Sequence, residues 1–84
     1  MYVARITSAK LLAHEIREKR RLAKMTQQDV AERIGIKQAT VSAFENHPEN
    51  CKIETLFNIL SSLGLEITLS KRSADAAKGW EEEW

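Results

Sequence analysis

The sequence TQQDVAERIGIKQATVSAFEN, residues 26–46, decides the fold. It opens on Thr26, a hydroxyl residue of the kind that caps the start of a helix. Asp29 follows three residues later, where a carboxylate complements the positive helix end. Gly35 then stands where a residue in the left-handed conformation would end the helix. The pattern predicts a short helix that closes in a sharp turn.

A second helix is predicted directly after this turn. Ile36 can fill the turn, and Ala39, Val41 and Phe44 are expected to face inward. Two short helices joined by a tight glycine turn form the plan of a helix-turn-helix. The other side chains of the second helix are then free to face outward.

The outward side chains suit the reading of base edges in a DNA major groove. Gln38 carries an amide that can bond adenine N6 and N7, and Lys37 can reach guanine or phosphate. Small side chains beside them offer methyl groups to thymine. The two glutamines that start the first helix could meet a phosphate or cap their own helix. A solvated helix face uses the same residue types, but the glycine turn and the flanking helices favour DNA binding. The candidate DNA-binding residues are Gln27, Gln28, Lys37, Gln38, Ala39, Thr40 and Ser42.

Length and composition indicate one small domain. A chain of 84 residues buries roughly 60 per cent of its surface on folding, which is a smaller share than a larger chain buries. A dimer partner would therefore add stability. It has neither a long apolar run nor a signal-peptide pattern, which predicts a cytoplasmic protein without a membrane partner. Cys51, His14 and His47 lack metal-ligand spacing, so no metal and no cofactor is expected.

The charges are distributed unevenly along the chain. Residues 1–52 hold ten Lys and Arg against six Asp and Glu, a balance of +4, whereas residues 53–84 hold three against six, a balance of −3. The predicted helix-turn-helix therefore lies in the basic half, as expected of a DNA-binding protein. Asymmetry of this size is also common in small proteins, so it supports the assignment without establishing it.

Two further helices are predicted to flank the helix-turn-helix. The first runs from Ala9 to about Lys24 after a cap at Ser8. The last runs from Ile53 to Leu63 and stops at a glycine. The predicted buried positions are Leu12, Ala13, Ile16 and Ala23 in the first helix and Leu56, Ile59, Leu60 and Leu63 in the last, and the candidate phosphate-contacting cations are Arg17, Lys19, Arg21 and Lys24.

The residues after the last helix, LEITLS, alternate strictly between apolar and polar and predict a strand over residues 65–70. A lone strand leaves its backbone groups unpaired, so we expect it to pair with the same strand of a second copy, or with residues 2–6. Leu65, Ile67 and Leu69 would then lie in the dimer interface. The prediction is an all-α fold, a compact helix-turn-helix domain of four to five helices over residues 8–70, with one C-terminal β-strand that pairs across a homodimer.

The two ends of the chain are predicted to lie outside this domain. Residues 1–7 form an N-terminal arm, and residues 71–84 form a flexible C-terminal tail rich in small and charged residues. The tail holds Trp80 and Trp84, large apolar side chains of the type that anchors a protein interface. Aromatic residues also occur in tails without any such role, and composition alone does not choose.

The stretch from Ile16 to Gly64 resembles the Xre and Cro repressors. The matching residues are Ile16, Arg20, Thr26, Gln27, Ala31, Gly35, Ser42, Phe44, Glu45, Leu56, Leu63 and Gly64. More narrowly, GIKQATVSAFENHPEN, the passage LSSLGLEITL and the terminal Glu83 and Trp84 resemble HipB-type antitoxins.

This resemblance implies a set of roles and partners. Arg20 and Glu45 would join the first and third helices by a salt bridge, so Glu45 would be structural. The strand would pair across the dimer, and the protein would bind palindromic operator DNA and a HipA-type serine/threonine kinase toxin. A terminal tryptophan enters a pocket of that kinase in such antitoxins, which makes Trp84, or alternatively Trp80, the toxin-binding residue. Asn46 and His47 stand where many relatives carry glycine, so the contacts of this loop differ.

The function predicted from this resemblance is that of a repressor of its own operon that also neutralises a toxin, located at the nucleoid in the cytoplasm. The alternative is a stand-alone Xre-family repressor, of prophage type, without a toxin partner. An enzyme is not expected, because the sequence has no glycine-rich phosphate loop and no nucleophile with supporting residues. No catalytic residue and no small-molecule substrate are therefore predicted.

Overall fold

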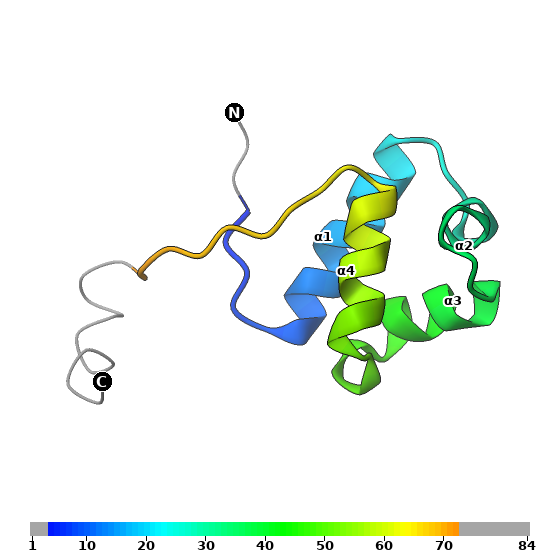
Figure 1. Cartoon of the computed structure of the whole chain (residues 1–84). Coiled ribbons are helices and arrows are strands. Elements are labelled where there is room, and N and C mark those ends of the chain that lie inside the picture. The colour runs from blue at the N-terminus through cyan, green and yellow to red at the C-terminus, as the bar shows by residue number, and fades with distance from the viewer. Residues whose placement is uncertain (1–3, 73–84) are drawn as a thin grey trace.

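The computed structural model describes residues 4–72, and all regular secondary structure in these residues is helical (Figure 1). Four α-helices and one turn of 3-10 helix follow one another in these residues, which confirms the predicted all-α helix-turn-helix domain. The elements are α1 (Ala9–Leu22), α2 (Gln27–Ile34), α3 (Gln38–Asn46), η1 (Pro48–Asn50) and α4 (Ile53–Ser62). The described residues contain no helix long and apolar enough to cross a membrane.

Helix α1 begins as predicted and ends two residues early. The Ser8 hydroxyl accepts the Leu11 N–H at 3.1 Å and so caps the helix start. At the other end the backbone of Lys24 adopts a positive φ of 58°, which no α-helix can contain. The predicted end at Lys24 is therefore wrong, and so is the predicted burial of Ala23, which lies exposed beyond the last helical turn.

Helix α2 has the ends that the sequence predicts. Thr26 Oγ1 accepts the Asp29 N–H at 3.0 Å, and the Asp29 carboxylate accepts the Thr26 N–H at 2.9 Å, so each residue satisfies a backbone donor of the other. Hydrogen bonds from Thr26 hold the pKa of Asp29 below its ordinary value of 3.8. Gly35 ends the helix in the left-handed conformation at φ 69°, which turns the chain directly into α3.

One hydrophobic core joins the four helices. Helix α2 packs against both α3 and α4, and α1 packs against α3. Val30 of α2, Val41 of α3 and Ile59 of α4 are almost completely buried where these helices meet. Gly64, at φ 69°, follows α4 as the predicted glycine stop. The core consists of Ala13, Ile16, Val30, Ala31, Val41, Phe44, Ile59 and Leu60, with the half-buried Leu12, Leu56, Leu63 and Leu65 packed against it.

Helix α3 shows one departure from the expected pattern. Val41 and Phe44 face the core as predicted, but Ala39 is exposed and does not join them. Positions 41 and 44 are three residues apart and share a face, whereas position 39 is rotated well away from position 44 on a helix of 3.6 residues per turn. The inward assignment of Ala39 is therefore wrong, and its methyl group is available at the surface.

The segment over residues 65–70 carries no strand in the described chain. It leaves the helices as an extended segment (Figure 1). Leu65 remains half-buried against the core, but Ile67 is 42% exposed and Leu69 is 92% exposed. A strand needs a partner to satisfy its backbone groups, so the pairing of this segment across a dimer stays a prediction.

Candidate nucleic-acid interface

The predicted reading face lies at the start of α3. Lys37, Gln38, Ala39 and Thr40 are all exposed, as contact with a major groove requires. Ser42 is half-buried, and its hydroxyl accepts a hydrogen bond from Asn46 Nδ2 at 3.2 Å. Four of the five predicted groove-facing side chains on or beside α3 are thus exposed to solvent, whereas Ser42 is half-buried and hydrogen-bonded within its own helix.

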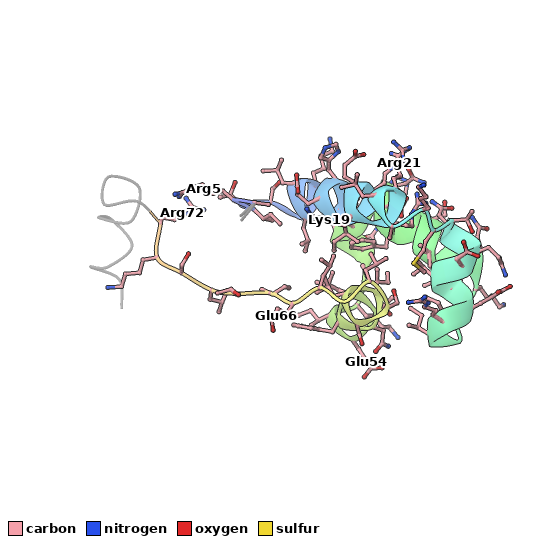
Figure 2. All side chains as sticks on the ribbon, turned by 90° about the horizontal axis from the view of Figure 1, so that it is seen from above. Arg5, Lys19, Arg21, Glu54, Glu66 and Arg72 are labelled. Carbon is pink, nitrogen blue, oxygen red and sulfur yellow. The ribbon has the colours of Figure 1, made fainter. Side chains whose placement is uncertain are left out.

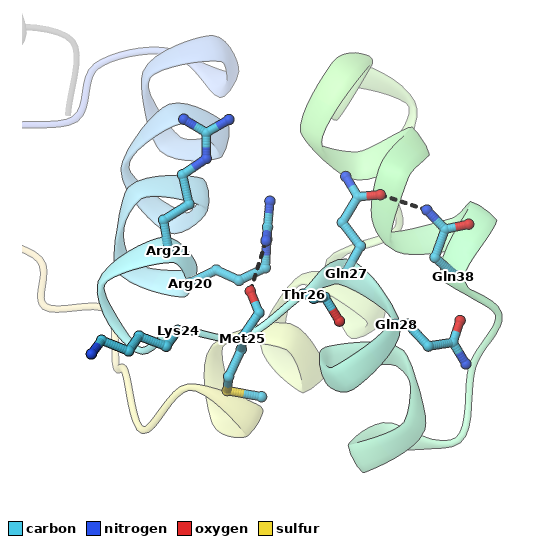
Figure 3. A pocket seen from close by; sticks show the side chains of 8 residues that line it. All are labelled: Arg20, Arg21, Lys24, Met25, Thr26, Gln27, Gln28 and Gln38. Atoms are coloured by element: carbon cyan, nitrogen blue, oxygen red, sulfur yellow. Dashed lines mark hydrogen bonds between the residues drawn. The ribbon is translucent and has the colours of Figure 1, made fainter.

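An open concavity lies beside this face, where the end of α1 meets the starts of α2 and α3 (Figure 3). Its volume is about 620 Å³. The residues that start α2 line this concavity, and a helix start favours a negatively charged ligand such as a phosphate. The residues that line the concavity are Arg20, Arg21, Lys24, Met25, Thr26, Gln27, Gln28 and Gln38.

The two helices of the motif are joined at this concavity through their first residues. Gln38 Nε2 donates to Gln27 Oε1 at 2.5 Å, which links the start of α3 to the start of α2 (Figure 3). Gln27 Nε2 in turn donates to Glu45 Oε1 at 3.0 Å. Gln28 points differently, because its amide donates to Glu32 Oε2 on its own helix at 2.9 Å. The sequence placed both glutamines at the helix start, but their different partners appear only in the structure.

A buried ion pair lies at the concavity, which Arg20 itself lines. Arg20 Nε donates to Glu45 Oε2 at 2.7 Å, and Arg20 Nη2 donates to Glu45 Oε1 at 3.1 Å. The guanidinium therefore binds both carboxylate oxygens in a bidentate pair. The same guanidinium donates through Nη1 to the Met25 carbonyl at 2.8 Å. This confirms the predicted salt bridge between the first and third helices. It also fixes the chain at Met25, just before α2 begins.

The charge on Glu45 is retained despite its burial. The side chain is only 3% exposed. Burial alone would raise the pKa of Glu45, but hydrogen bonds from Arg20 and Gln27, together with the charges of Arg20 and Arg17, outweigh it and hold the pKa below its ordinary value of 4.5. Glu45 is therefore a carboxylate at neutral pH and can only accept hydrogen bonds.

The cations predicted to contact phosphate fall into two groups. Arg21 and Lys24 line the concavity, where a DNA backbone could reach them. Arg17 Nε instead lies 3.9 Å from Glu45 Oε1. Figure 2 shows Lys19 and Arg21 on α1, whereas the acidic Glu54 and Glu66 lie on the α4 side of the domain.

The other predicted positions carry no site in the described part of the chain. Cys51 is half-buried, and burial raises the pKa of its thiol, as expected of a small structural cysteine. Residues 4–72 contain no group of three or more side chains that could hold a metal ion. Trp80 and Trp84 lie outside the described residues.

This chain is similar to one protein family and to two curated proteins. The helix-turn-helix family pattern matches residues 16–69. A curated relative named antitoxin HipB, from Escherichia coli O6:H1, is 41% identical over 87 residues, which cover 100% of this chain and 93% of the relative. A second antitoxin HipB, from Escherichia coli strain K12, is 45% identical over 69 residues, which cover 82% of this chain and 78% of the relative.

Solved structures of the same kind share the fold. One is a HipB variant in complex with an O2 20mer, with a TM-score of 0.83 and 42% identity over 86% of this chain and 100% of that chain. Another is a HipA-HipB-O2-O3 complex, with a TM-score of 0.82 and 42% identity over 84% of this chain and 100% of that chain. A HipB-O4 20mer complex matches equally well, with a TM-score of 0.82. The described fold is therefore the fold of HipB.

Proposed function

This chain belongs to the helix-turn-helix family of HipB antitoxins, and from that premise we propose that it is a DNA-binding antitoxin. As a dimer it represses its own operon, and it also binds and neutralises a HipA-type serine/threonine kinase toxin. The observation that carries the proposal is the 41–45% identity to HipB over most of the chain. The likeness to HipB structures complexed with 20mers, read as operator DNA, supports the DNA-binding half.

In the DNA-binding half, α3 enters the major groove and the concavity receives the DNA backbone. Gln38 reads a base, Lys37 reaches guanine or phosphate, and Ala39, Thr40 and Ser42 line the groove-facing side. Gln27 and Gln28 hold a phosphate at the start of α2, where the helix dipole favours an anion. The exposure of residues 37–40 and the position of both glutamines at the concavity support this arrangement.

The dimer supplies the symmetry that a palindromic operator requires. A helix-turn-helix dimer sets its two reading helices about one DNA turn apart, roughly 34 Å. We propose that residues 65–70 pair as a strand with the same segment of a second copy, through Leu65, Ile67 and Leu69. The exposure of Ile67 and Leu69 in the single chain supports this, because pairing would cover apolar surface now in contact with water.

The toxin-binding half rests on the C-terminal tail. The similarity to HipB in a HipA-HipB-O2-O3 complex supports a kinase of the HipA type as the partner. Trp84 is the proposed anchor, and Trp80 is the alternative anchor four residues earlier. Such a protein works by binding, so no catalytic residue is assigned. We infer that it acts in the cytoplasm at the nucleoid, where its operator lies.

Deletion of Trp84 tests the two halves separately. The variant should bind the upstream DNA of its own gene with nearly unchanged affinity, because the tail is distant in sequence from the reading helix. Its capture of the kinase encoded beside it should fall, as measured by pull-down with purified proteins. Trp80→Ala is the matched variant, since only the tryptophan that docks should matter. Capture at wild-type strength by both variants would count against the tail tryptophans as the anchor, whereas no capture by the wild-type protein would favour a stand-alone repressor.

A further inference from the structure

We propose that Arg33 is a positioning residue that sets the distance between the two DNA half-sites that the dimer binds. Its guanidinium joins α2, the first helix of the helix-turn-helix, to the end of α4, after which residues 65–70 leave for the proposed dimer contact. The inference rests on the proposed function of a dimeric DNA-binding protein. It assigns to one side chain the task of holding the DNA-binding helices at a fixed angle to the dimer segment.

The end of α4 needs a hydrogen-bond donor from outside the helix. The Leu65 N–H donates to the Leu60 carbonyl at 2.9 Å, and the Gly64 N–H donates to the Ser61 carbonyl at 3.1 Å. These two bonds form a Schellman motif, with Gly64 in the left-handed conformation at φ 69°. The motif satisfies two of the last carbonyls of the helix, but it supplies no donor to the carbonyl of Ser62.

Arg33 supplies this donor from α2. Arg33 Nη1 donates to the Ser62 carbonyl at 3.0 Å, across 29 positions of the sequence. A cation at the C-terminal end of a helix also interacts favourably with the negative end of the helix dipole. Ser62 itself is buried, and the bond is partly shielded from water, so salt screens it less than an exposed contact. The contact is therefore the kind of charge-assisted bond that holds two helices in one arrangement.

Helix α2 connects the DNA side of the domain to the dimer side. Its first residues, Gln27 and Gln28, line the concavity proposed to receive the DNA backbone, whereas Arg33 lies in its last turn. Residues 65–70 begin three positions after Ser62 and extend away from α2 (Figure 1). The bond between Arg33 and Ser62 thus fixes the direction in which the dimer segment leaves, relative to the helix that meets DNA.

This direction determines which spacing of half-sites the dimer can bind. Each base pair added between two half-sites moves them apart by about 3.4 Å and rotates one against the other by about a tenth of a turn. A dimer with a rigid joint binds an altered spacing only if a contact at that joint breaks. The wild-type chain would have to give up the bond between Arg33 and Ser62, whereas a variant without this bond has no such contact to lose.

Anisotropy titration of three DNA duplexes tests the inference. One duplex carries the operator that the wild type selects, and the other two have one base pair more or one fewer between the half-sites. The wild type should bind both altered duplexes more weakly. Arg33→Met keeps the aliphatic stem but removes the guanidinium, and it should reduce this spacing discrimination about fivefold to tenfold, the factor that one hydrogen bond supplies. Arg33→Gln, which also lacks the guanidinium, gives the same readout if the methionine variant fails to fold.

Two control variants separate positioning from a loss of stability or of charge. Ser62→Ala removes the hydroxyl that donates to the Ile59 carbonyl at 2.7 Å, but it retains the backbone carbonyl that Arg33 binds. It should destabilise the same helix end and leave the spacing discrimination unchanged. Lys52→Met removes one positive charge at the opposite end of α4, so any loss of affinity should be equal for the three duplexes. Circular dichroism and light scattering would verify that each variant is folded and dimeric.

The outcomes distinguish this inference from the proposed function. A wild-type protein that forms no dimer or binds no DNA selectively would overturn both. A wild type that binds its operator and the two altered duplexes equally well would overturn only the positioning role. The same holds if Arg33→Met retains the full spacing discrimination, or if Ser62→Ala loses as much of it as Arg33→Met does.

Discussion

The Arg20 guanidinium lies 2.7 Å from the Glu45 carboxylate and joins α1 to α3 at the concavity proposed to receive the DNA backbone. Arg20 also bonds the chain before α2, and Glu45 bonds Gln27 at the start of that helix. One buried ion pair therefore touches all three helices that form the concavity. Stability of the domain and the shape of its DNA-binding surface depend on the same contact.

Removing one partner of this pair should destabilise the domain strongly. Arg20→Met would leave the Glu45 carboxylate buried without its main partner, at a cost of about 3 to 5 kcal/mol in the free energy of unfolding. Urea unfolding would measure the loss. Arg21→Met is the matched control, because the exposed Arg21–Glu18 pair at 3.5 Å contributes at most about 1 kcal/mol. Equal losses in the two variants would contradict the buried pair's importance.

The same carboxylate should make stability depend on acidity. The pKa of Glu45 is lower in the folded chain than its ordinary value of 4.5, so its contribution is fully present above that value. It is lost as the pH falls through the lower, folded pKa, since the unfolded chain takes up the proton first. Urea unfolding at several pH values should therefore show a shallower acid decline for Glu45→Gln than for wild type. Parallel declines would refute this.

The cap of α2 should contribute measurably to stability. Thr26→Ala removes the hydroxyl that accepts the Asp29 N–H, and the expected loss is about 1 kcal/mol. Thermal unfolding followed by circular dichroism would detect it. Ser61→Ala, at an exposed position inside α4, removes a hydroxyl that caps no helix and should change stability little. A Thr26→Ala variant as stable as Ser61→Ala would show that the cap is dispensable.

The proposed dimer strand can be tested through its alternation. Ile67→Asp places a charge on the apolar face of residues 65–70 and should reduce both association and operator binding. Thr68→Asp introduces the same charge on the opposite face and should have a smaller effect. Light scattering reports the mass of each variant in solution. A dimer unchanged by Ile67→Asp would remove the strand from the interface.

The reading helix should show two kinds of contact. Gln38→Ala should cost about 1 to 3 kcal/mol of operator affinity and relax preference at one base pair. Lys37→Ala should lower affinity and, if Lys37 meets phosphate, reduce the slope of affinity against salt concentration by about one unit. Titrations at several salt concentrations separate the two effects. If neither substitution changed operator affinity, the assignment of α3 as the helix that recognises base pairs would be wrong.

Local signals made most of the fold predictable. The cap at Thr26, the glycines at 35 and 64 and the apolar spacing of α4 each act within a few residues, so the helix ends that they set were predicted to within one residue. The end of α1 was predicted two residues too late because Lys24 adopts a left-handed backbone conformation. A lysine rarely adopts this conformation, so the sequence does not indicate it.

The contacts of the site could be predicted only in part. The sequence predicted that Lys37, Gln38 and Thr40 are exposed at the start of α3, and the family resemblance gave the pair of Arg20 and Glu45. The link from Glu45 through Gln27 to Gln38 depends on how three helices cross, and the residues involved are 18 and 11 positions apart. Sequence spacing does not determine such crossings. The strand at residues 65–70 depends on a second copy and could not be settled from one chain.

The most direct test of the proposed function is a fluorescence-anisotropy titration of the protein on its own upstream DNA, with scrambled DNA as the control, at two salt concentrations. We predict tight, sequence-selective binding with two chains per site, and weaker binding at the higher salt concentration. Equally weak binding to both DNAs would contradict a repressor that recognises its operator alone.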